Sequence, residues 1–443
     1  MLFFYIYIFF YIFLYQKYIE RREMNLGKNF LIQALRENEL AKGKKGDDYF
    51  NCNASVVSYS TGYPVLDYYL GYKVNVFNKK NEFIESYPSL GITAGSFVMF
   101  IGKPSTSKTS TAISIAGNIV RNFDNGTVLH YDLELATNYT RIQALTRLPM
   151  QAMREGKYIL RQEQTTLEDI KASIIRVYNE KINNPDKYKY KTGKMNEFNE
   201  EIEIFEPTVV IIDSIATITM AMEDGSAKSL AKAEEIGTQT DRMRLTGEIG
   251  RFFNEIMPYI RTANITVIGI NQIKVNPQMG LIKQPAQIIG LQMSENVPGG
   301  YAPLFLAHIL LRFNAVTSEK YSDEEDGWGG FKVKCDVIKS RVSQALKSCY
   351  LMYDKTHGVD MVRSTVEYAK DMGLVGGNRN GYYFNDNKDE KFTLRSMPAD
   401  FRANPKLYKI MKDNVIPLLE QNLSSMAPEE MYVPEEEMNF YDL

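Results

Sequence analysis

The chain has 443 residues, 44% of them hydrophobic, which is enough for one large core of roughly 200 to 250 residues with smaller appended units. Its formal net charge is only −2, so composition shows no bias towards nucleic acid, and any DNA site must come from a local arrangement of Lys and Arg. Cys52, Cys335 and Cys349 form no CxxC pair, which argues against a zinc site and for a reducing compartment such as the cytoplasm.

The N-terminal segment is unlike the rest of the chain. Residues 1–15 are almost wholly aromatic and aliphatic, but a membrane-spanning helix needs about 20 residues. The segment also has neither the basic start nor the small-residue cleavage site of a signal peptide. We therefore expect residues 1–23 to be an upstream translated extension or a weakly membrane-associating segment, and we expect no membrane partner. Residues 24–95 are predicted to form a small helical region that serves oligomerisation and enters the core.

From about residue 96 the sequence has the pattern of a parallel sheet, because short Val- and Ile-rich runs without polar alternation are separated by helical stretches. This predicts an α/β core over residues 96–355 with a doubly wound, mainly parallel sheet. Residues 356–425 are predicted to form a small C-terminal α/β unit with a helix and a short hairpin, and residues 426–443 an acidic tail. The predicted strands cover residues 96–102, 127–132, 208–213, 265–271, 307–313, 331–339 and 348–354.

Two charged segments interrupt the core, at residues 179–203 and 318–330, and we expect both to be solvated loops. In the first, Lys and Tyr alternate from Lys187 to Lys191. Such a run can contact nucleic acid by charge and by stacking, and the alternative is an ordinary exposed face.

One predicted strand runs directly into a loop of small and polar residues, and a helix follows. A loop that wraps a phosphate presents backbone N–H groups, a lysine neutralises phosphate charge, and a hydroxyl holds magnesium. Lys108 and Thr109 would fill the last two roles, so the sequence predicts a site for ATP and Mg²⁺. Ser107 replaces the glycine that normally precedes the lysine, and its Cβ is expected to strain the backbone. The predicted nucleotide-binding residues are Gly102, Lys103, Pro104, Ser105, Thr106, Ser107, Lys108, Thr109 and Ser110.

Acidic residues follow two other predicted strands. Asp213 ends the strand at 208–213, and ligands bind at the carboxyl ends of the strands in such sheets. Its carboxylate is therefore expected to hold Mg²⁺, directly or through water. Glu134 follows the strand at 127–132, where it is placed to polarise an attacking water as a general base.

With the loop around Lys108 and the runs HYDLE, VVIIDS and GINQI in this order, the chain resembles the RecA family of recombinases. It is especially similar to phage recombinases of the UvsX kind, which also lack the glycine at the position of Ser107. The resemblance covers roughly residues 56–385 and includes the upstream run STGYPVLDYYLG. It implies a RecA-type P-loop ATPase core. Together with abundant Ile, Lys, Asn, Tyr and Phe, it favours a phage source and thus the host cytoplasm.

The resemblance also implies roles for individual residues. Glu134 matches the water-activating glutamate, and Gln272 matches a glutamine that senses the γ-phosphate and signals to a DNA-binding loop directly after it. Lys339 and Arg341 match basic residues that reach the ATP of a neighbouring subunit. Tyr139 is a candidate for stacking on adenine, although its spacing from Glu134 departs from the family pattern.

Two DNA-binding loops follow from the same resemblance, within residues 223–244 and 274–300. The second is longer than an ordinary connector and is rich in Pro, Gly and apolar residues. For each charge in these loops, an ordinary surface position is the alternative. The predicted DNA-binding residues are Lys228, Lys232, Arg242 and Arg244 in the first loop and Lys274, Lys283, Gly299 and Gly300 in the second.

The function implied by the resemblance is that of a DNA-dependent ATPase, which hydrolyses ATP to ADP and phosphate and forms a helical filament with ATP between subunits. It would pair single-stranded DNA with a homologous duplex, and its phosphate contacts would be insensitive to sequence. Expected partners are single-stranded and double-stranded DNA, further copies of the chain, and single-strand-binding and mediator proteins. Two alternatives stay open: a ring-forming motor such as a replicative helicase, and a recombination mediator with a decayed ATP site.

Overall fold

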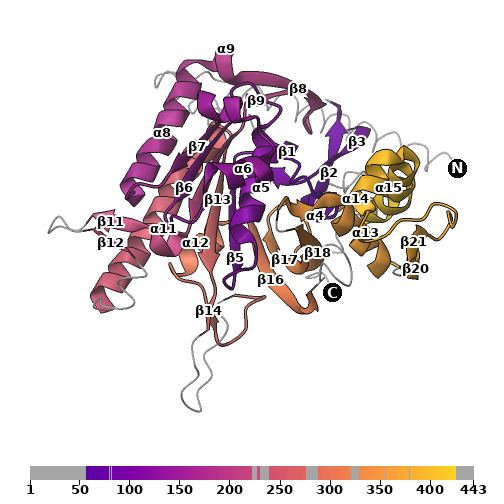
Figure 1. The fold of residues 1–443 in the computed structure, drawn as a ribbon. Helices are drawn as coiled ribbons and strands as arrows, with labels where there is room; N and C mark the ends of the chain where they lie inside the picture. The colour runs from indigo at the N-terminus through magenta and orange to yellow at the C-terminus, as the bar shows by residue number, and fades with distance from the viewer. Residues whose placement is uncertain are drawn as a thin grey trace, which may run out of the picture. The chain divides into compact units, whose positions relative to one another are not determined.

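The computed structural model describes residues 56–78, 80, 82–221, 227–229, 239–275, 288–320, 329–354, 356–378 and 380–425. All of them lie within one compact unit, Asn53–Leu443, which is drawn in Figure 1. The hydrophobic segment of residues 1–23 and the acidic tail of residues 426–443 lie outside the described residues.

A nine-stranded mixed sheet forms the centre of this unit, in the order β19-β18-β17-β16-β5-β13-β10-β6-β7 (Figure 1). The strands from β16 to β7 are parallel, and β17, β18 and β19 continue the sheet in antiparallel pairs. Their bounds are β5 Phe97–Gly102, β6 Thr127–Asp132, β7 Tyr158–Arg161, β10 Thr208–Asp213, β13 Ile265–Gln272, β16 Ile309–Lys320, β17 Phe331–Ser340, β18 Lys347–Asp354 and β19 Gly358–Asp360.

The mainly parallel α/β sheet predicted from the sequence is confirmed, and each predicted strand is present. The sequence pattern missed β7 and β19, which are only four and three residues long. It also missed the antiparallel side of the sheet. The connection from Ser340 to Lys347 is too short for a crossover, which needs a dozen or more residues, so β17 and β18 must be antiparallel neighbours.

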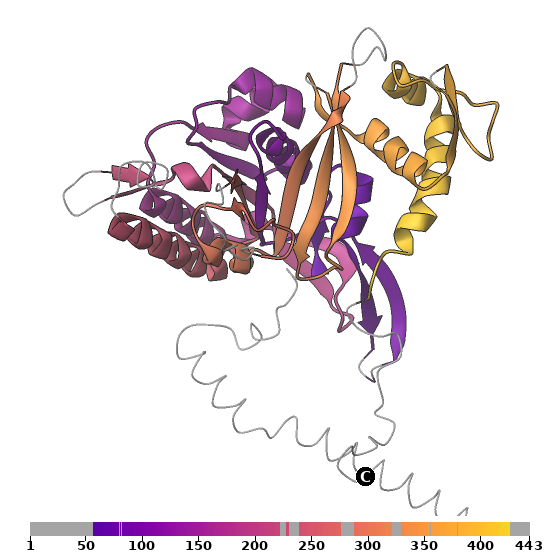
Figure 2. The same ribbon diagram turned by 90° about the horizontal axis from the view of Figure 1, so that it is seen from below.

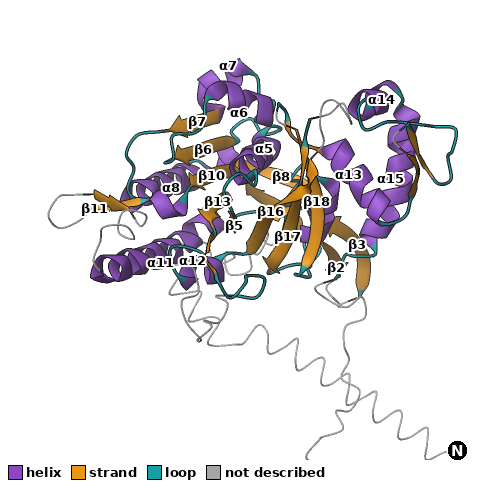
Figure 3. Cartoon of the chain, turned by 60° about the horizontal axis from the view of Figure 1, so that its bottom comes forward, coloured by secondary structure: helices purple, strands orange, loops and turns teal. Residues whose placement is uncertain are grey.

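Helices cover both faces of the sheet, which explains why its central strands lack polar alternation. On β5, Val98 and Phe100 enter one buried cluster, whereas Phe97, Met99 and Ile101 enter another. The first cluster includes residues of α5 (Lys108–Val120) and α6 (Tyr139–Thr146). The second includes residues of α8 (Leu167–Asn183), α11 (Gln239–Thr262) and α12 (Tyr301–Leu306), which lie together in Figure 3.

The described part of the predicted N-terminal region holds strands as well as a helix. The helix is α4 (Pro64–Leu70), which begins with proline at its first position. Two antiparallel pairs accompany it: β1 (Ser58–Tyr59) with β4 (Ile92–Thr93), and β2 (Tyr72–Phe77) with β3 (Phe83–Ser89). The expectation of a helical region over residues 24–95 is therefore wrong from residue 56 onward.

The expectation of a solvated loop at residues 179–203 is also wrong. After α8 and a short α9 (Pro185–Tyr188), the chain forms a hairpin of β8 (Lys189–Met195) and β9 (Glu201–Phe205). In β9 the alternating sequence EIEIF buries Ile202 and Ile204. This period of two is the signal of a half-buried strand that the charged composition obscured. In the second expected loop, β16 extends to Lys320, and residues 321–328 lie outside the described part.

The C-terminal residues contain the predicted helix and hairpin. These are α13 (Met361–Asp371), β20 (Val375–Asn378) and β21 (Gly381–Phe384), and two further helices follow, α14 (Met397–Ala403) and α15 (Pro405–Glu420). The helices share a buried cluster with one face of the main sheet. Figure 2 shows the C-terminal helices in yellow on the side of the sheet formed by the orange strands. The predicted boundary after residue 355 cuts β19 from that sheet. Within the described residues, no helix combines the length and the apolar character needed to cross a membrane.

Candidate nucleotide site

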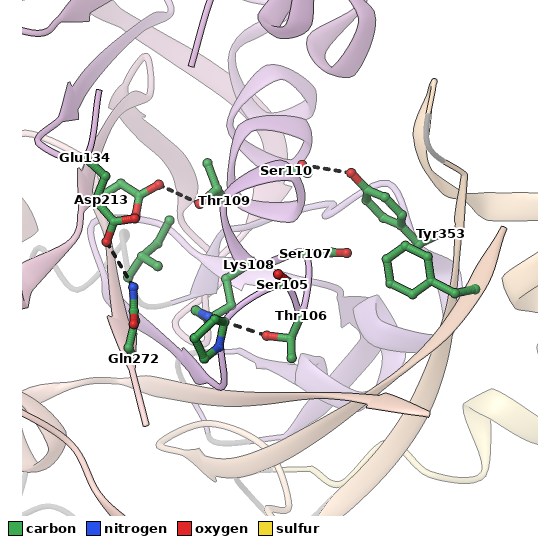
Figure 4. Close-up of a pocket in the computed structure, with 13 residues that line it drawn as sticks. Ser105, Thr106, Ser107, Lys108, Thr109, Ser110, Glu134, Asp213, Gln272 and Tyr353 are labelled. Atoms are coloured by element: carbon green, nitrogen blue, oxygen red, sulfur yellow. Dashed lines mark hydrogen bonds between the residues drawn. The ribbon is translucent and has the colours of Figure 1, made fainter. Parts of the chain in front are cut away.

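A pocket of about 470 Å³ lies at the edge of the sheet where the parallel strands end (Figure 4). Most of the predicted nucleotide and catalytic residues meet there. Its lining consists of Pro104, Ser105, Thr106, Ser107, Lys108, Thr109, Ser110, Glu134, Asp213, Ile270, Gln272, Phe331 and Tyr353.

The strand register explains why residues so far apart in the chain converge. Gly102 at the end of β5 is paired with Gln272 of β13, while Ile270 of β13 is paired with Asp213 of β10. Asp213 is in turn paired with Asp132, the last residue of β6. Parallel strands in register end at one edge, so the residues at and just after their ends face one site.

The turn from Gly102 to Ser107 has a backbone geometry that few residue types adopt. A Cβ added at Gly102 would lie 2.4 Å from the carbonyl oxygen of Phe313, so this position requires glycine. Ser105 and Ser107 have φ angles of 60° and 65°, in the left-handed region that glycine normally occupies. For an L-residue this region costs about 1–2 kcal/mol. The strain expected at Ser107 is therefore confirmed, and the structure accommodates it.

Lys108, the first residue of α5, folds back over the loop. Its ammonium group donates to the carbonyl oxygens of Gly102 at 3.1 Å and Lys103 at 2.8 Å. Burial lowers the pKa of Lys108 to about 8, while the nearby carboxylates of Asp213 and Glu134 oppose this shift. Its described partners are neutral oxygens, so the ammonium group is held where a phosphate oxygen can replace them.

Thr109 and Asp213 supply oxygen ligands that suit Mg²⁺. The Thr109 hydroxyl donates to Asp213 Oδ2 at 2.6 Å. Burial raises the pKa of Asp213 to about 6; the Thr109 hydrogen bond and Lys108 lower it, and Glu134 and Asp132 raise it further. A buried carboxylate beside other acids favours a cation, and Mg²⁺ is commonly held by one or two carboxylates together with substrate phosphates. These two residues therefore fit the predicted ion.

Glu134 lies beside Gln272 at the pocket. The Gln272 side-chain amide donates to Glu134 Oε1 at 3.3 Å (Figure 4). The loop that carries Glu134 is shaped by Asp132, which is buried and accepts from the Thr137 backbone N–H and the Gln162 amide, both at 2.8 Å. The structure therefore brings the predicted base and the predicted γ-phosphate sensor into contact.

Two aromatic residues at the pocket were missed by the sequence reasoning. The rings of Phe331 and Tyr353 are 4.7 Å apart, and the Tyr353 hydroxyl donates to Ser110 Oγ at 3.0 Å. Arg141 donates to the same hydroxyl. Phe331 begins β17, and only the antiparallel direction of that strand brings its start to this edge of the sheet. Reading every strand as parallel would place Phe331 at the opposite edge.

Tyr139 is not part of the pocket. It begins α6 and is 44% exposed, and it does not line the cavity. The aromatic wall near the phosphate loop is instead formed by Phe331 and Tyr353. Tyr139 stays a predicted base-stacking residue, and Tyr353, which lines the pocket, is a second candidate.

Lys339 and Arg341 also lie away from the pocket of their own chain. Ser340 and Val98 are both paired with Ile309, at the end of β5 opposite Gly102. At about 3.3 Å per residue, the strand separates the two places by about 13 Å. Lys339 donates to the carbonyl oxygens of Leu304 and Phe305, and Arg341 donates to that of Phe305 at 3.1 Å. Both side chains therefore hold the end of α12.

The predicted DNA-binding residues are described only in part. Lys232 and Lys283 lie outside the described residues, and for Lys228 in β12 (Ala227–Ser229) and Arg242 in α11 only the backbone is described. Arg244 on α11 is exposed.

In the second predicted DNA loop, Lys274 is exposed in β14 (Lys274–Val275), which pairs with β15 (Glu295–Asn296). Gly299 and Gly300 have φ angles of 93° and 78° and form the turn into α12. A Cβ at Gly300 would lie 2.5 Å from a Thr246 methyl carbon. The two glycines are thus required by the turn, whatever they bind.

Comparison with known proteins adds one similarity. No protein-family model matches the chain. The chain is similar to Protein RecA of Ruminococcus albus, with 27% identity over 172 residues. The match covers 38% of this chain and 36% of that protein, so the chain spans about a third of the length of the relative it matches. This similarity supports a relationship of the chain to the RecA family.

Proposed function

We propose that the chain is an ATP-dependent DNA recombinase of the RecA type, which forms filaments on single-stranded DNA and catalyses homologous pairing and strand exchange. The observation that carries this proposal is the contact between Glu134 and Gln272 in the pocket beside Lys108. Gln272 ends β13, directly before the segment predicted to bind DNA. The similarity to a RecA protein supports the same conclusion.

Nucleotide binding would use the loop of residues 102–107 and the start of α5. Lys108 exchanges the carbonyl oxygens of Gly102 and Lys103 for phosphate oxygens, which restores a charged partner to a partly desolvated ammonium group. Mg²⁺, held by Thr109 and Asp213, would neutralise phosphate charge. The Tyr353 ring offers a stacking face for the base at the other end of the pocket.

Hydrolysis would depend on Glu134 as the general base that orients and polarises water. In the structure its carboxylate accepts from the Gln272 amide. An amide in this position can donate either to the carboxylate or to a phosphate oxygen, so its orientation can differ between the bound and the hydrolysed state. This gives the end of β13 a means to respond to the nucleotide.

Assembly would complete the site from a neighbouring copy. Lys339 and Arg341 cannot reach the pocket of their own chain, and both hold the end of α12. On that helix Tyr301 and Phe305 are 54% and 63% exposed, an apolar surface next to two cations. We infer that this surface meets the next subunit and delivers cations to its ATP, so that hydrolysis requires the filament.

The test is ATP hydrolysis and strand exchange by the purified chain, with and without single-stranded DNA. We expect hydrolysis to be stimulated by DNA, and we expect a labelled strand to be exchanged into a homologous duplex but not into an unrelated one. Lys108→Ala is the matched control and should fail in both assays. Stimulated hydrolysis without strand exchange, together with closed rings in electron microscopy, would identify a ring-forming motor instead. Absence of hydrolysis with retained DNA binding would identify a mediator.

A further inference from the structure

The chain contacts residues 288–298, which return to the core, both directly before and directly after Gln272. Directly after Gln272 and Ile273, β14 pairs with β15, with Val275 opposite Glu295. Directly before it, the buried Asn271 side chain donates to the carbonyl oxygen of Pro298 at 2.7 Å. Movement of the returning limb, residues 288–298, therefore displaces the backbone around Gln272.

One buried ion pair fixes this returning limb to the sheet. Arg312, on β16, donates from Nη2 to Glu295 Oε1 at 2.8 Å, and the side chains are 11% and 2% exposed. A second guanidinium nitrogen of Arg312 donates to the carbonyl oxygen of Gly290. The other oxygen of the Glu295 carboxylate accepts from the backbone N–H of Gln292 at 2.9 Å. A single guanidinium thus holds the limb at two points.

The position of this pair in the sheet connects it to the pocket. Arg312 is paired with Ile101, the residue before Gly102, on the neighbouring strand β5. Glu295 stands opposite Val275, which is three residues after Gln272. The pair therefore connects β16, the neighbour of the strand that leads into the phosphate loop, with the ladder that extends from the Gln272 strand.

We propose that Arg312 and Glu295 are positioning residues, which hold the β14–β15 ladder so that DNA bound beside it controls the placement of Gln272 against Glu134. This inference rests on the proposed function and deepens it, because it names the contact through which DNA regulates hydrolysis. Neither residue lines the pocket, so both act through Gln272. Loss of the pair should uncouple DNA binding from hydrolysis and leave the nucleotide site itself intact.

The test compares Arg312→Met with Arg363→Met. Arg363 also donates to a nearby carboxylate, Asp360 at 2.6 Å, and to a backbone carbonyl, and its side chain is similarly buried, but it lies on α13. For Arg312→Met we expect the ratio of hydrolysis rates with and without oligonucleotide to fall about tenfold, since residues on a coupling network typically change coupling to about this extent. Its affinity for a fluorescent ATP analogue should change less than about twofold, because Arg312 does not line the pocket. Arg363→Met should keep the wild-type ratio.

The outcomes separate the inference from the function on which it rests. Folded Arg312→Met protein with the wild-type ratio, or an equal loss in Arg363→Met, would overturn the role of the pair while leaving the proposed function intact. Wild-type protein whose hydrolysis ignores DNA would overturn both. If Arg312→Met does not fold, Glu295→Gln replaces it, because the amide keeps an acceptor for Arg312 while removing the charge. A wild-type ratio in folded Glu295→Gln would then count against the proposal, and a reduced ratio would support it.

Discussion

Two regions of the molecule contain lysines beside carboxylates, and they differ in how these groups are held. At the pocket, Lys108 and Asp213 are buried, and burial shifts the pKa of each towards the neutral range. Ser107, next to them, has a left-handed backbone. Each of these features costs stability and is retained only where the surroundings enforce it.

The β8–β9 hairpin shows the contrasting arrangement. Lys189 and Lys191 pair with Glu203 and Glu201 at 3.5 and 2.7 Å, and each of the four side chains is at least 32% exposed. Exposed pairs of this kind contribute little, about 0–1 kcal/mol. Residue type alone therefore does not identify a site. In the run from Lys187 to Lys191, Lys187 and Tyr188 end α9, and Tyr190 in β8 packs against Phe123.

The largest effect is expected at the buried lysine. Among the described residues that line the pocket, Lys108 is the only one with a positive charge, so Lys108→Ala should abolish nucleotide binding and not merely weaken it. Isothermal titration with ATP and Mg²⁺ measures this directly. Binding within about tenfold of wild type, a difference of only about 1.4 kcal/mol, would contradict the assignment of the pocket.

The second effect concerns the rate and not the affinity. Glu134→Gln keeps the shape of the side chain but cannot accept a proton, so hydrolysis should fall by about 10² to 10⁴. Binding of ATP and of single-stranded DNA should persist, giving a stalled complex. A stopped assay of released phosphate gives the rate. Normal DNA-stimulated hydrolysis in this variant would remove Glu134 from the mechanism.

The third effect is a pH dependence that the hairpin lysines would not produce. Burial raises the pKa of Asp213 to about 6, so this carboxylate loses its charge, and with it Mg²⁺ affinity, as the pH falls below that value. Burial lowers the pKa of Lys108 to about 8, so the ammonium charge is lost as the pH rises above that value. Affinity of the free protein for ATP and Mg²⁺ should therefore be greatest between pH 6 and 8, with limbs of up to about tenfold per pH unit. Asp213→Asn should abolish the acidic limb, and an unchanged limb in that variant would refute the assignment.

A fourth, smaller effect distinguishes two tyrosines. Tyr353→Ala removes a stacking face of the pocket, and base stacking on an aromatic ring is worth about 1–3 kcal/mol, so nucleotide affinity should fall at least about fivefold. Tyr353→Phe keeps the ring and should bind nearly as well as wild type. Tyr139→Ala should have no effect. If Tyr139→Ala is the weaker binder of the two alanine variants, Tyr139 and not Tyr353 is the stacking residue.

The smallest effect is expected at the hairpin itself. Replacing Lys189 and Lys191 with alanine removes two exposed ion pairs and should lower the free energy of unfolding by less than about 1 kcal/mol for each pair. Affinity for single-stranded DNA should not change. A loss of DNA affinity, with a weaker dependence on salt, would instead return this run to the DNA-binding surface.

The sequence was sufficient to predict the part of the site that follows from local pattern. Lys108, Thr109 and Asp213 each stand at the end of a buried strand or the start of the helix that follows it, and the parallel register then brings them together. Gln272 and Glu134 are placed by the same rule. The apolar runs in the sequence locate the strands. Because parallel strands end at one edge of the sheet, the positions of the strand ends then predict where these residues meet.

What could not be predicted depends on strand direction and on tertiary packing. Phe331 reaches the pocket only because β17 is antiparallel to β16, and no local pattern near Phe331 specifies that direction. The β8–β9 hairpin was obscured because its exposed face carries the charges of a loop. The Arg312–Glu295 pair joins residues 17 positions apart whose proximity follows from the fold alone.

We infer that the nucleotide held beside Lys108 controls the affinity of the chain for DNA. The test is fluorescence anisotropy of a labelled single-stranded oligonucleotide, with and without a non-hydrolysable ATP analogue and Mg²⁺. We expect at least about tenfold tighter binding with the analogue, equivalent to about 1.4 kcal/mol of coupling, and no such gain for Lys108→Ala. Equal affinity of the wild-type chain for the oligonucleotide in both conditions would contradict it.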